Sequence, residues 1–174
     1  MKDYDIIYSI GIFLTFSVAL INLFLTLKNN RKNIFINSVT NSRIKYIQEI
    51  RNNISEFCGI VHSYCFFGGK LDDKNLFDLQ THADKTKYLI RLYLNPEDKF
   101  WDEKIIKLLD EILELTDKNP TEKIDELILI TQYLLKLEWE GAKLESEKGI
   151  LKKSEKEKLY RKYVDLYQEA IKNL

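Results

Sequence analysis

The most prominent hydrophobic feature of the chain is an uninterrupted apolar segment near its start. Residues 6–27 are 22 positions without a charged side chain, and 16 of them are apolar. As a helix with a rise of about 1.5 Å per residue, the segment is roughly 33 Å long, enough to cross a bilayer once. A cleaved signal peptide would need a basic leader and a small-x-small cleavage site, and a buried core helix is the other alternative. The pattern predicts one transmembrane helix within residues 1–28.

Basic residues follow the apolar segment directly. Lys28, Arg31 and Lys32 come after it, whereas Lys2 is the single lysine before it. Lysine and arginine are enriched in loops that stay on the cytoplasmic side of a membrane. We therefore expect a single-pass protein of the cell inner membrane, with its N-terminus outside and residues 29–174 in the cytoplasm.

Small and polar residues form a stripe along the apolar segment. They recur every three or four positions, on one helical face: Tyr8, Gly11, Thr15, Ala19, Asn22 and Thr26. Small residues permit close packing of membrane helices, and an asparagine that faces lipid is costly. We predict that this face is a helix interface or the lining of a pore. A single anchor that tolerates Asn22 near its cytoplasmic end is the alternative.

Beyond the apolar segment, hydrophobic residues recur at intervals of three and four, which predicts helices. The first stretch contains Ile47, Ile50, Ile54, Phe57, Val61 and Tyr64. It should end at Gly68 and Gly69, because glycine commonly terminates helices. Two Asn-Pro junctions, at Asn95 and Asn119, are expected to cap further helices, with the proline at the first helical position.

The remaining helices are each predicted from one apolar face. A second helix should begin after the polar residues 72–75, and a last one should begin after a break at Gly149. The predicted faces are, in chain order, Leu76, Leu79, Ala83, Ile90 and Tyr93; Trp101, Ile105, Leu108, Ile112 and Leu115; Ile124, Leu127, Thr131, Leu134 and Glu138; and Leu159, Tyr163, Leu166, Ala170 and Ile171. The predicted fold class is all-α: one N-terminal transmembrane helix, then a cytosolic bundle of about five helices over residues 29–174.

Composition supports long helices and narrows the function. The 174 residues include only six glycines and two prolines, which disfavours a turn-rich β-sandwich or barrel. The 27 basic and 27 acidic side chains give a net charge of zero, which argues against a protein that binds nucleic acid over its whole surface.

The chain offers no evident catalytic or metal-binding pattern. Glycine-rich phosphate loops and the H-E-x-x-H motif are absent from the sequence. Cys58, His62 and Cys65 follow helical spacing, but the two cysteines would lie about 10 Å apart, too far to share a zinc ion or form a disulfide. His82 has no nucleophile or paired carboxylate at a telling spacing. We therefore expect a protein that is not an enzyme and uses no metal or cofactor.

Two local clusters stand out. Arg43, Lys45, Tyr46 and Arg51 lie in the first cytosolic helix. Arginine with an aromatic ring can hold a phosphate and stack a base, although pairing with lipid headgroups or acidic neighbours is the alternative. The second cluster is Glu138-Trp139-Glu140, where the tryptophan suits packing against a neighbouring helix.

In these clusters the sequence resembles a set of small bacterial single-pass membrane proteins. They have one N-terminal transmembrane helix, then a segment like residues 41–51, and later a motif like Glu138-Trp139-Glu140. Tyr46 departs from the set, which usually has tryptophan there. Some of these proteins resemble the channel subunit of Hailong-type anti-phage defence systems, in which a nucleotidyltransferase supplies the controlling oligonucleotide.

The resemblance implies an oligomeric ion channel in antiviral defence, gated through its cytosolic bundle by a nucleotide or oligonucleotide. Its partners would be the lipid bilayer, other copies of the same chain, with a tetramer as one alternative, and that ligand. The pore or helix interface would comprise Gly11, Thr15, Ala19, Asn22 and Thr26, and the ligand would contact Arg43, Lys45, Tyr46 and Arg51. The alternative function is a non-catalytic membrane tether or scaffold that recruits a cytosolic partner.

Overall fold

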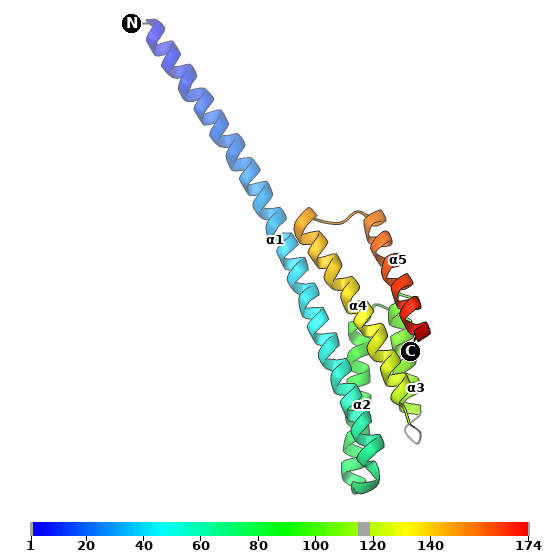
Figure 1. The fold of residues 1–174 in the computed structure, drawn as a ribbon. Coiled ribbons are helices and arrows are strands. Elements are labelled where there is room, and N and C mark those ends of the chain that lie inside the picture. The colour runs from blue at the N-terminus through cyan, green and yellow to red at the C-terminus, as the bar shows by residue number, and fades with distance from the viewer. Residues whose placement is uncertain (1, 115–118, 174) are drawn as a thin grey trace. The chain divides into compact units, whose positions relative to one another are not determined.

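The computed structural model describes residues 2–114 and 119–173 (Figure 1). For residues 2–9, 31, 32, 35 and 173 it describes the backbone alone, so the predictions for the side chains of Tyr8, Arg31 and Lys32, and for Leu115, lie outside the described residues. The described parts of the chain form five α-helices and two short 3-10 helices, and they contain no strand. The all-α prediction is confirmed.

The chain divides into two compact units, Met1–Val39 and Thr40–Leu174. The first helix, α1, comprises Lys2–Phe67, so the boundary between the units falls within a helix. The backbone is therefore helical on both sides of the junction.

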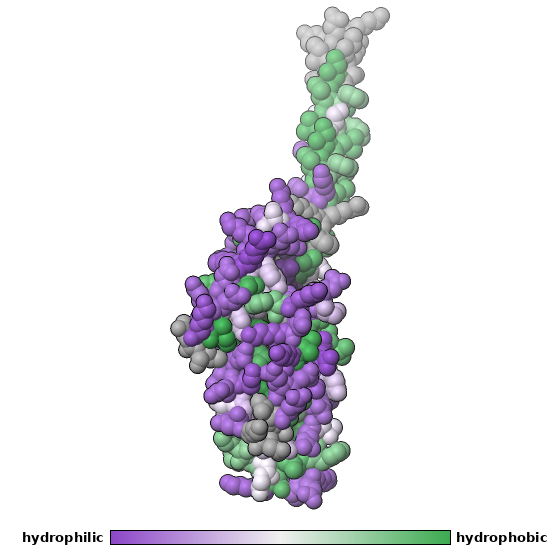
Figure 2. Space-filling model, turned by 90° about the vertical axis from the view of Figure 1, so that its right-hand side faces the viewer, coloured by the Kyte–Doolittle hydropathy of each residue, from purple (hydrophilic) through white to green (hydrophobic). Residues whose placement is uncertain are grey.

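In the first unit, α1 carries an apolar segment, Ile10–Asn30, none of which is buried. Figure 2 shows this segment as a mostly hydrophobic surface, whereas the surface of the second unit is largely hydrophilic. The helix is long and apolar enough to cross a membrane, and a signal sequence would also meet these criteria.

In the second unit, residues 40–67 of α1 pack with four further helices around one core. These helices are α2 (Asp73–Tyr93), α3 (Trp101–Glu114), α4 (Thr121–Lys148) and α5 (Lys153–Ala170), and the short 3-10 helices are η1 (Gly68–Lys70) and η2 (Ile171–Asn173). The largest fully buried side chains are Trp101, Tyr167, Phe57, Ile50, Ile90, Ile105, Leu109, Ile112, Leu127 and Ile130. The bundle predicted from the three-four periodicity is confirmed.

Helix boundaries follow the local hydrogen-bond acceptors. The end of α1 at Phe67, before a glycine pair, is confirmed. The start of α2 lies within the polar stretch rather than after it, because the Asp72 carboxylate accepts the backbone N–H of Asn75 at 2.8 Å and caps the helix. Gly149, with φ of 86°, ends α4, as the break predicted there requires.

The predicted cap at Asn95 is wrong. The helix after this junction, α3, begins at Trp101, and the Asp98 carboxylate accepts the N–H groups of Phe100 and Trp101, both at 2.9 Å. Asn95 instead accepts the N–H of Glu97 at 3.1 Å in the preceding turn. Two acceptors compete within this segment, and Asp98 is the one beside the buried Trp101.

At the second Asn-Pro junction the structure agrees more closely with the prediction. Pro120 is the residue immediately before α4, and the Asn119 side chain accepts the N–H of Thr121 at 3.1 Å. The predicted start is therefore displaced by one residue.

Two predicted core positions are also wrong. Tyr93 is exposed at the end of α2, and Leu166 of α5 is 38% exposed. On α5 the buried residues are Tyr163 and Tyr167, four positions apart, so Leu166 lies on the flank of that face.

Candidate functional site

The two sequence clusters meet in the second unit through Arg43. Its Nε lies 3.1 Å from Oε2 of Glu138, and its Nη1 lies 3.3 Å from Oε2 of Glu145. Lys156 Nζ lies 3.3 Å from the other oxygen of Glu145. These four residues, the Arg43 network, join α1, α4 and α5.

Gly141 provides the space for the Arg43 guanidinium against α4. This glycine is buried, and a Cβ atom at its position would lie 2.7 Å from Arg43 Nη1. A side chain there would displace the guanidinium from its place. The place of the guanidinium beside the carboxylates of α4, rather than the approach of the two helix backbones, therefore depends on a residue without a Cβ.

Acidic groups gather beside this network. Burial raises the pKa of the Glu138 carboxyl, with Arg43 acting in the opposite direction. Asp102, at the start of α3, is 4% exposed and accepts the backbone N–H of Asn95. Burial raises the pKa of Asp102 to about 6, the N–H of Asn95 lowers it, and Asp98 and Glu138 raise it further.

Tyr46 faces these acids. Burial is the main cause of its raised pKa, and Asp102 and Glu138 add to it. The ring is partly buried and packs against the core.

We expect the replacement of Asp102 by asparagine to stabilise the protein at neutral pH. The folded pKa of about 6 exceeds the ordinary value of 3.8, so the folded state binds more protons between these values. The free energy of unfolding therefore falls as pH rises from about 4 to 6, and the full penalty remains above 6. Asparagine keeps an acceptor for the Asn95 N–H and removes the charge.

Urea unfolding should show this variant more stable by about 1 to 2 kcal/mol at pH 7.5, and close to the parent below pH 4. Some pH dependence should persist in the variant, because the raised pKa of Glu138 acts with the same sign. A variant less stable than the parent at pH 7.5 would show that the Asp102 charge is favourable.

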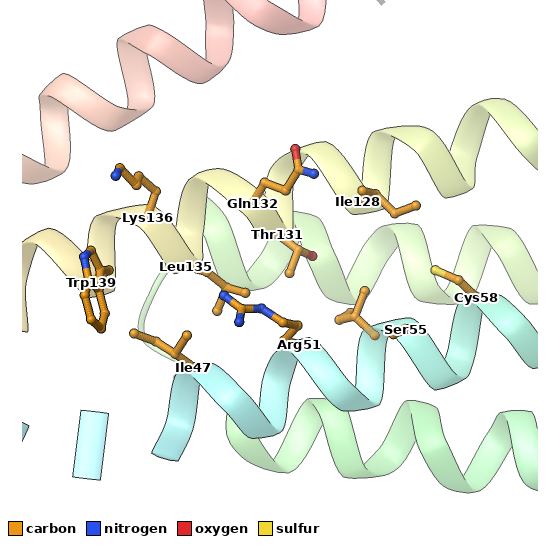
Figure 3. Close-up of a pocket in the computed structure, with 11 residues that line it drawn as sticks. Ile47, Arg51, Ser55, Cys58, Ile128, Thr131, Gln132, Leu135, Lys136 and Trp139 are labelled. Carbon is orange, nitrogen blue, oxygen red and sulfur yellow. The ribbon is translucent and has the colours of Figure 1, made fainter. Parts of the chain in front are cut away.

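A groove lies between α1 and α4, with a volume of about 760 Å³ (Figure 3). Both walls are helix faces, on which the lining residues recur every three or four positions. The α1 wall contains Ile47, Arg51, Ile54, Ser55 and Cys58, and the α4 wall contains Ile128, Thr131, Gln132, Leu135, Lys136 and Trp139. Volumes of this size are typical of sites for small molecules.

The groove combines apolar walls with two cationic side chains, Arg51 and Lys136, and one indole. Figure 3 shows the Arg51 guanidinium in the space between α1 and α4, beside Leu135. No carboxylate among the described residues lies within ion-pair distance of Arg51. Trp139, 48% exposed, lies at the end of the groove near Ile47. An anion with an apolar body would find complementary groups here.

The four predicted ligand residues therefore do not share one site. Arg43 pairs with Glu138 and Glu145, and Tyr46 is partly buried against the core. Lys45 is exposed, and Arg51 lines the groove. Of the two readings of Arg43, pairing with acidic neighbours describes its contacts in this structure.

Sequence reasoning missed most of the groove. Trp139 was expected to pack on a neighbouring helix, whereas half of it is open to solvent. Ser55, Gln132 and Lys136 were not singled out. The matching spacing of the two walls was a usable signal, but it did not say that these faces oppose each other. A further pair, His82 Nε2 with Glu56 Oε1 at 2.8 Å, joins α2 to α1 and was also unforeseen.

The polar stripe lies on the part of α1 that belongs to the first unit. Gly11, Thr15, Ala19, Asn22 and Thr26 are all exposed. The Thr15 hydroxyl donates to the carbonyl of Gly11 at 2.8 Å, which satisfies it within the helix. The Asn22 side-chain amide has no hydrogen-bond partner among the described residues.

Comparison with known proteins found no matching family model, no matching curated protein and no matching solved structure.

Proposed function

We propose that this chain is an oligomeric single-pass membrane effector. Its N-terminal helices form a gated ion path, and its helical unit, residues 40–174, controls that path from the cytoplasm. The observation that carries the proposal is the Asn22 amide, which is exposed and unpartnered on the small and polar face of an apolar helix.

The amide favours assembly over a lone anchor. In hydrocarbon, a polar group without a hydrogen-bond partner costs free energy, and a neighbouring helix can supply the partner. The hydroxyls of Thr15 and Ser17 already donate to carbonyls of their own helix, each at 2.8 Å. Asn22 and Thr26 have no such partner among the described residues, and the Asn22 amide, with two donors and a carbonyl, gains most from a second copy or from water in a pore.

The helical unit supports the controlling role. The two segments that carry the resemblance to anti-phage membrane proteins, residues 41–51 and 138–140, contact each other through Arg43 and Glu138 at 3.1 Å. The resemblance supplies a nucleotide or oligonucleotide as the gating ligand and a role in antiviral defence. The basic residues after the apolar segment, such as Lys28, favour a cytoplasmic C-terminus.

Ion flux through purified full-length protein in liposomes tests the proposal. We expect flux in the parent that changes when an oligonucleotide is added, and at least a tenfold loss of that flux in Asn22→Leu, because leucine removes the polar group from the path. Ser17→Leu is the matched control. It removes a polar side chain from the opposite face of the same segment and should conduct like the parent.

Two results would contradict the proposal. Full flux in Asn22→Leu would refute the assignment of this face. No flux from a folded, inserted and ligand-exposed parent that stays monomeric would favour the membrane tether instead.

A further inference from the structure

The groove between α1 and α4 has mostly apolar ends, and its polar residues lie between them. Residues 47–58 and 128–139 form its two walls, each about 16 Å long as helix. One end is formed by Cys58 and Ile128, and the other by Ile47 and Trp139 (Figure 3). Arg51 projects into the groove between these ends. An occupant therefore meets a cation beside a long apolar surface.

Arg51 is suited to hold an anion. Guanidinium groups bind carboxylate and phosphate through paired hydrogen bonds. Within the described parts of the chain no acidic side chain neutralises Arg51. Lys136, at the rim, forms an ion pair with Glu140, with 3.4 Å between Nζ and Oε1. The uncompensated charge inside the groove thus belongs to Arg51.

The body of the occupant is better matched by an aliphatic chain than by a base. The groove walls include Ile54, Leu135 and Ile128, all aliphatic, and Trp139 is their one aromatic ring. The Thr131 hydroxyl is already used, since it donates to the carbonyl of Leu127 at 2.7 Å. Ser55 and Gln132 are the other uncharged polar side chains of the lining, and apolar surface exceeds polar surface in the groove.

We propose that this groove binds a single-chain amphiphilic anion, with its charged head at Arg51, its chain along the aliphatic walls and the Trp139 indole covering one end. The class includes fatty carboxylates and lysophosphates, which share an anionic head and one acyl chain. The inference rests on the proposed function only in placing the helical unit beside a bilayer, which is the source of such molecules. It adds a lipid input to the proposed channel, separate from the nucleotide ligand.

Trp139 fluorescence provides a direct test. The full-length protein in phosphatidylcholine nanodiscs is titrated with dibrominated stearate, whose bromine atoms quench a tryptophan that they contact. Trp101, the other tryptophan, is fully buried in the core, so quenching should disappear in Trp139→Phe. The methyl ester of the same acid is the neutral control. A lysophosphatidic acid with a brominated chain shows whether phosphate serves as well as carboxylate.

Two variants test the role of the charge. In Arg51→Gln, the concentration of the acid that gives half-maximal quenching should rise at least tenfold. Quenching by the ester should be unchanged. Arg91→Gln, at an exposed arginine in the last turn of α2, is the matched control and should bind like the parent. As a second measurement, the acid should slow alkylation of Cys58, which lines the groove, in a Cys65→Ser background.

Three results would overturn the inference. Equal quenching by acid and ester would indicate partition from the bilayer without recognition of charge. Unchanged quenching in Arg51→Gln would remove the assigned contact. Displacement of the acid from Trp139 by an oligonucleotide at lower concentration would assign the groove to nucleotides. Binding is read separately from ion flux, so a protein that binds the acid without conducting would refute the channel and keep this site.

Discussion

Replacing Arg43 by alanine is expected to lower the free energy of unfolding of the helical unit by about 2 to 4 kcal/mol. The Glu145 side chain is only 6% exposed and has Arg43 and Lys156 as its ion-pair partners. Removing Arg43 leaves Glu138 and Glu145 close to each other with a single lysine, and the loss of one partner from a buried pair is strongly destabilising. Arg43 and Glu138 are themselves partly exposed, which keeps the expected loss below the upper limit.

Urea unfolding followed by circular dichroism measures this loss. Lys45→Ala is the matched control: Lys45 is exposed, two positions away on the same helix, and its replacement should change stability by less than about 0.5 kcal/mol. If Arg43→Ala lowered the free energy of unfolding by this little, water would replace the guanidinium at little cost. Arg43 would then again be a candidate ligand-binding residue.

Arg43 and Arg51 have different contacts, so we expect their replacement to have different effects. Arg43 is satisfied by acids of its own chain, so its removal should act on folding. Arg51 has no such partner in the described residues, so its removal should act on an anion in the groove. Both arginines belong to one cluster in the sequence, yet their surroundings give them different roles.

The periodicity of apolar residues predicted the helices well, because this signal is local. Ile47, Ile50, Ile54, Phe57 and Val61 are all buried, as their three-four spacing requires. The signal was weaker at helix starts, where several acceptors compete within a few residues. Asn95 and Asp98 both accept backbone N–H groups, and only the three-dimensional position of the chain decides which one caps α3.

The candidate site was harder to predict because its parts are distant in the chain. Arg43 and Glu138 were each noted, but nothing local indicates that they pair, and the space that Gly141 provides is evident only in three dimensions. The groove requires two helix faces to be apposed while their side chains leave space between them. Pairing of helix faces is a tertiary property that periodicity does not encode.

Replacing Trp101 by alanine is expected to lower the free energy of unfolding by about 3 to 5 kcal/mol, a large part of the stability of a domain of this size. Trp101 is fully buried at the start of α3. Its ring centroid lies 4.9 Å from that of Phe100, 6.3 Å from that of Tyr160 and 5.7 Å from that of Tyr167, all in edge-to-face arrangements. The variant should lose the packing of α5 first, because both tyrosines belong to that helix.

Trp139, the second tryptophan, is the control for this prediction. Trp139→Ala, at a half-exposed position, should cost less than about 1 kcal/mol and abolish the fluorescence response in the groove. Trp101→Phe should lose much less stability than Trp101→Ala, because the indole N–H has no acceptor among the described residues and the ring mainly fills space. Similar losses in Trp101→Ala and Trp139→Ala would contradict the assignment of Trp101 to the core and Trp139 to the groove, since burial is what distinguishes the two rings.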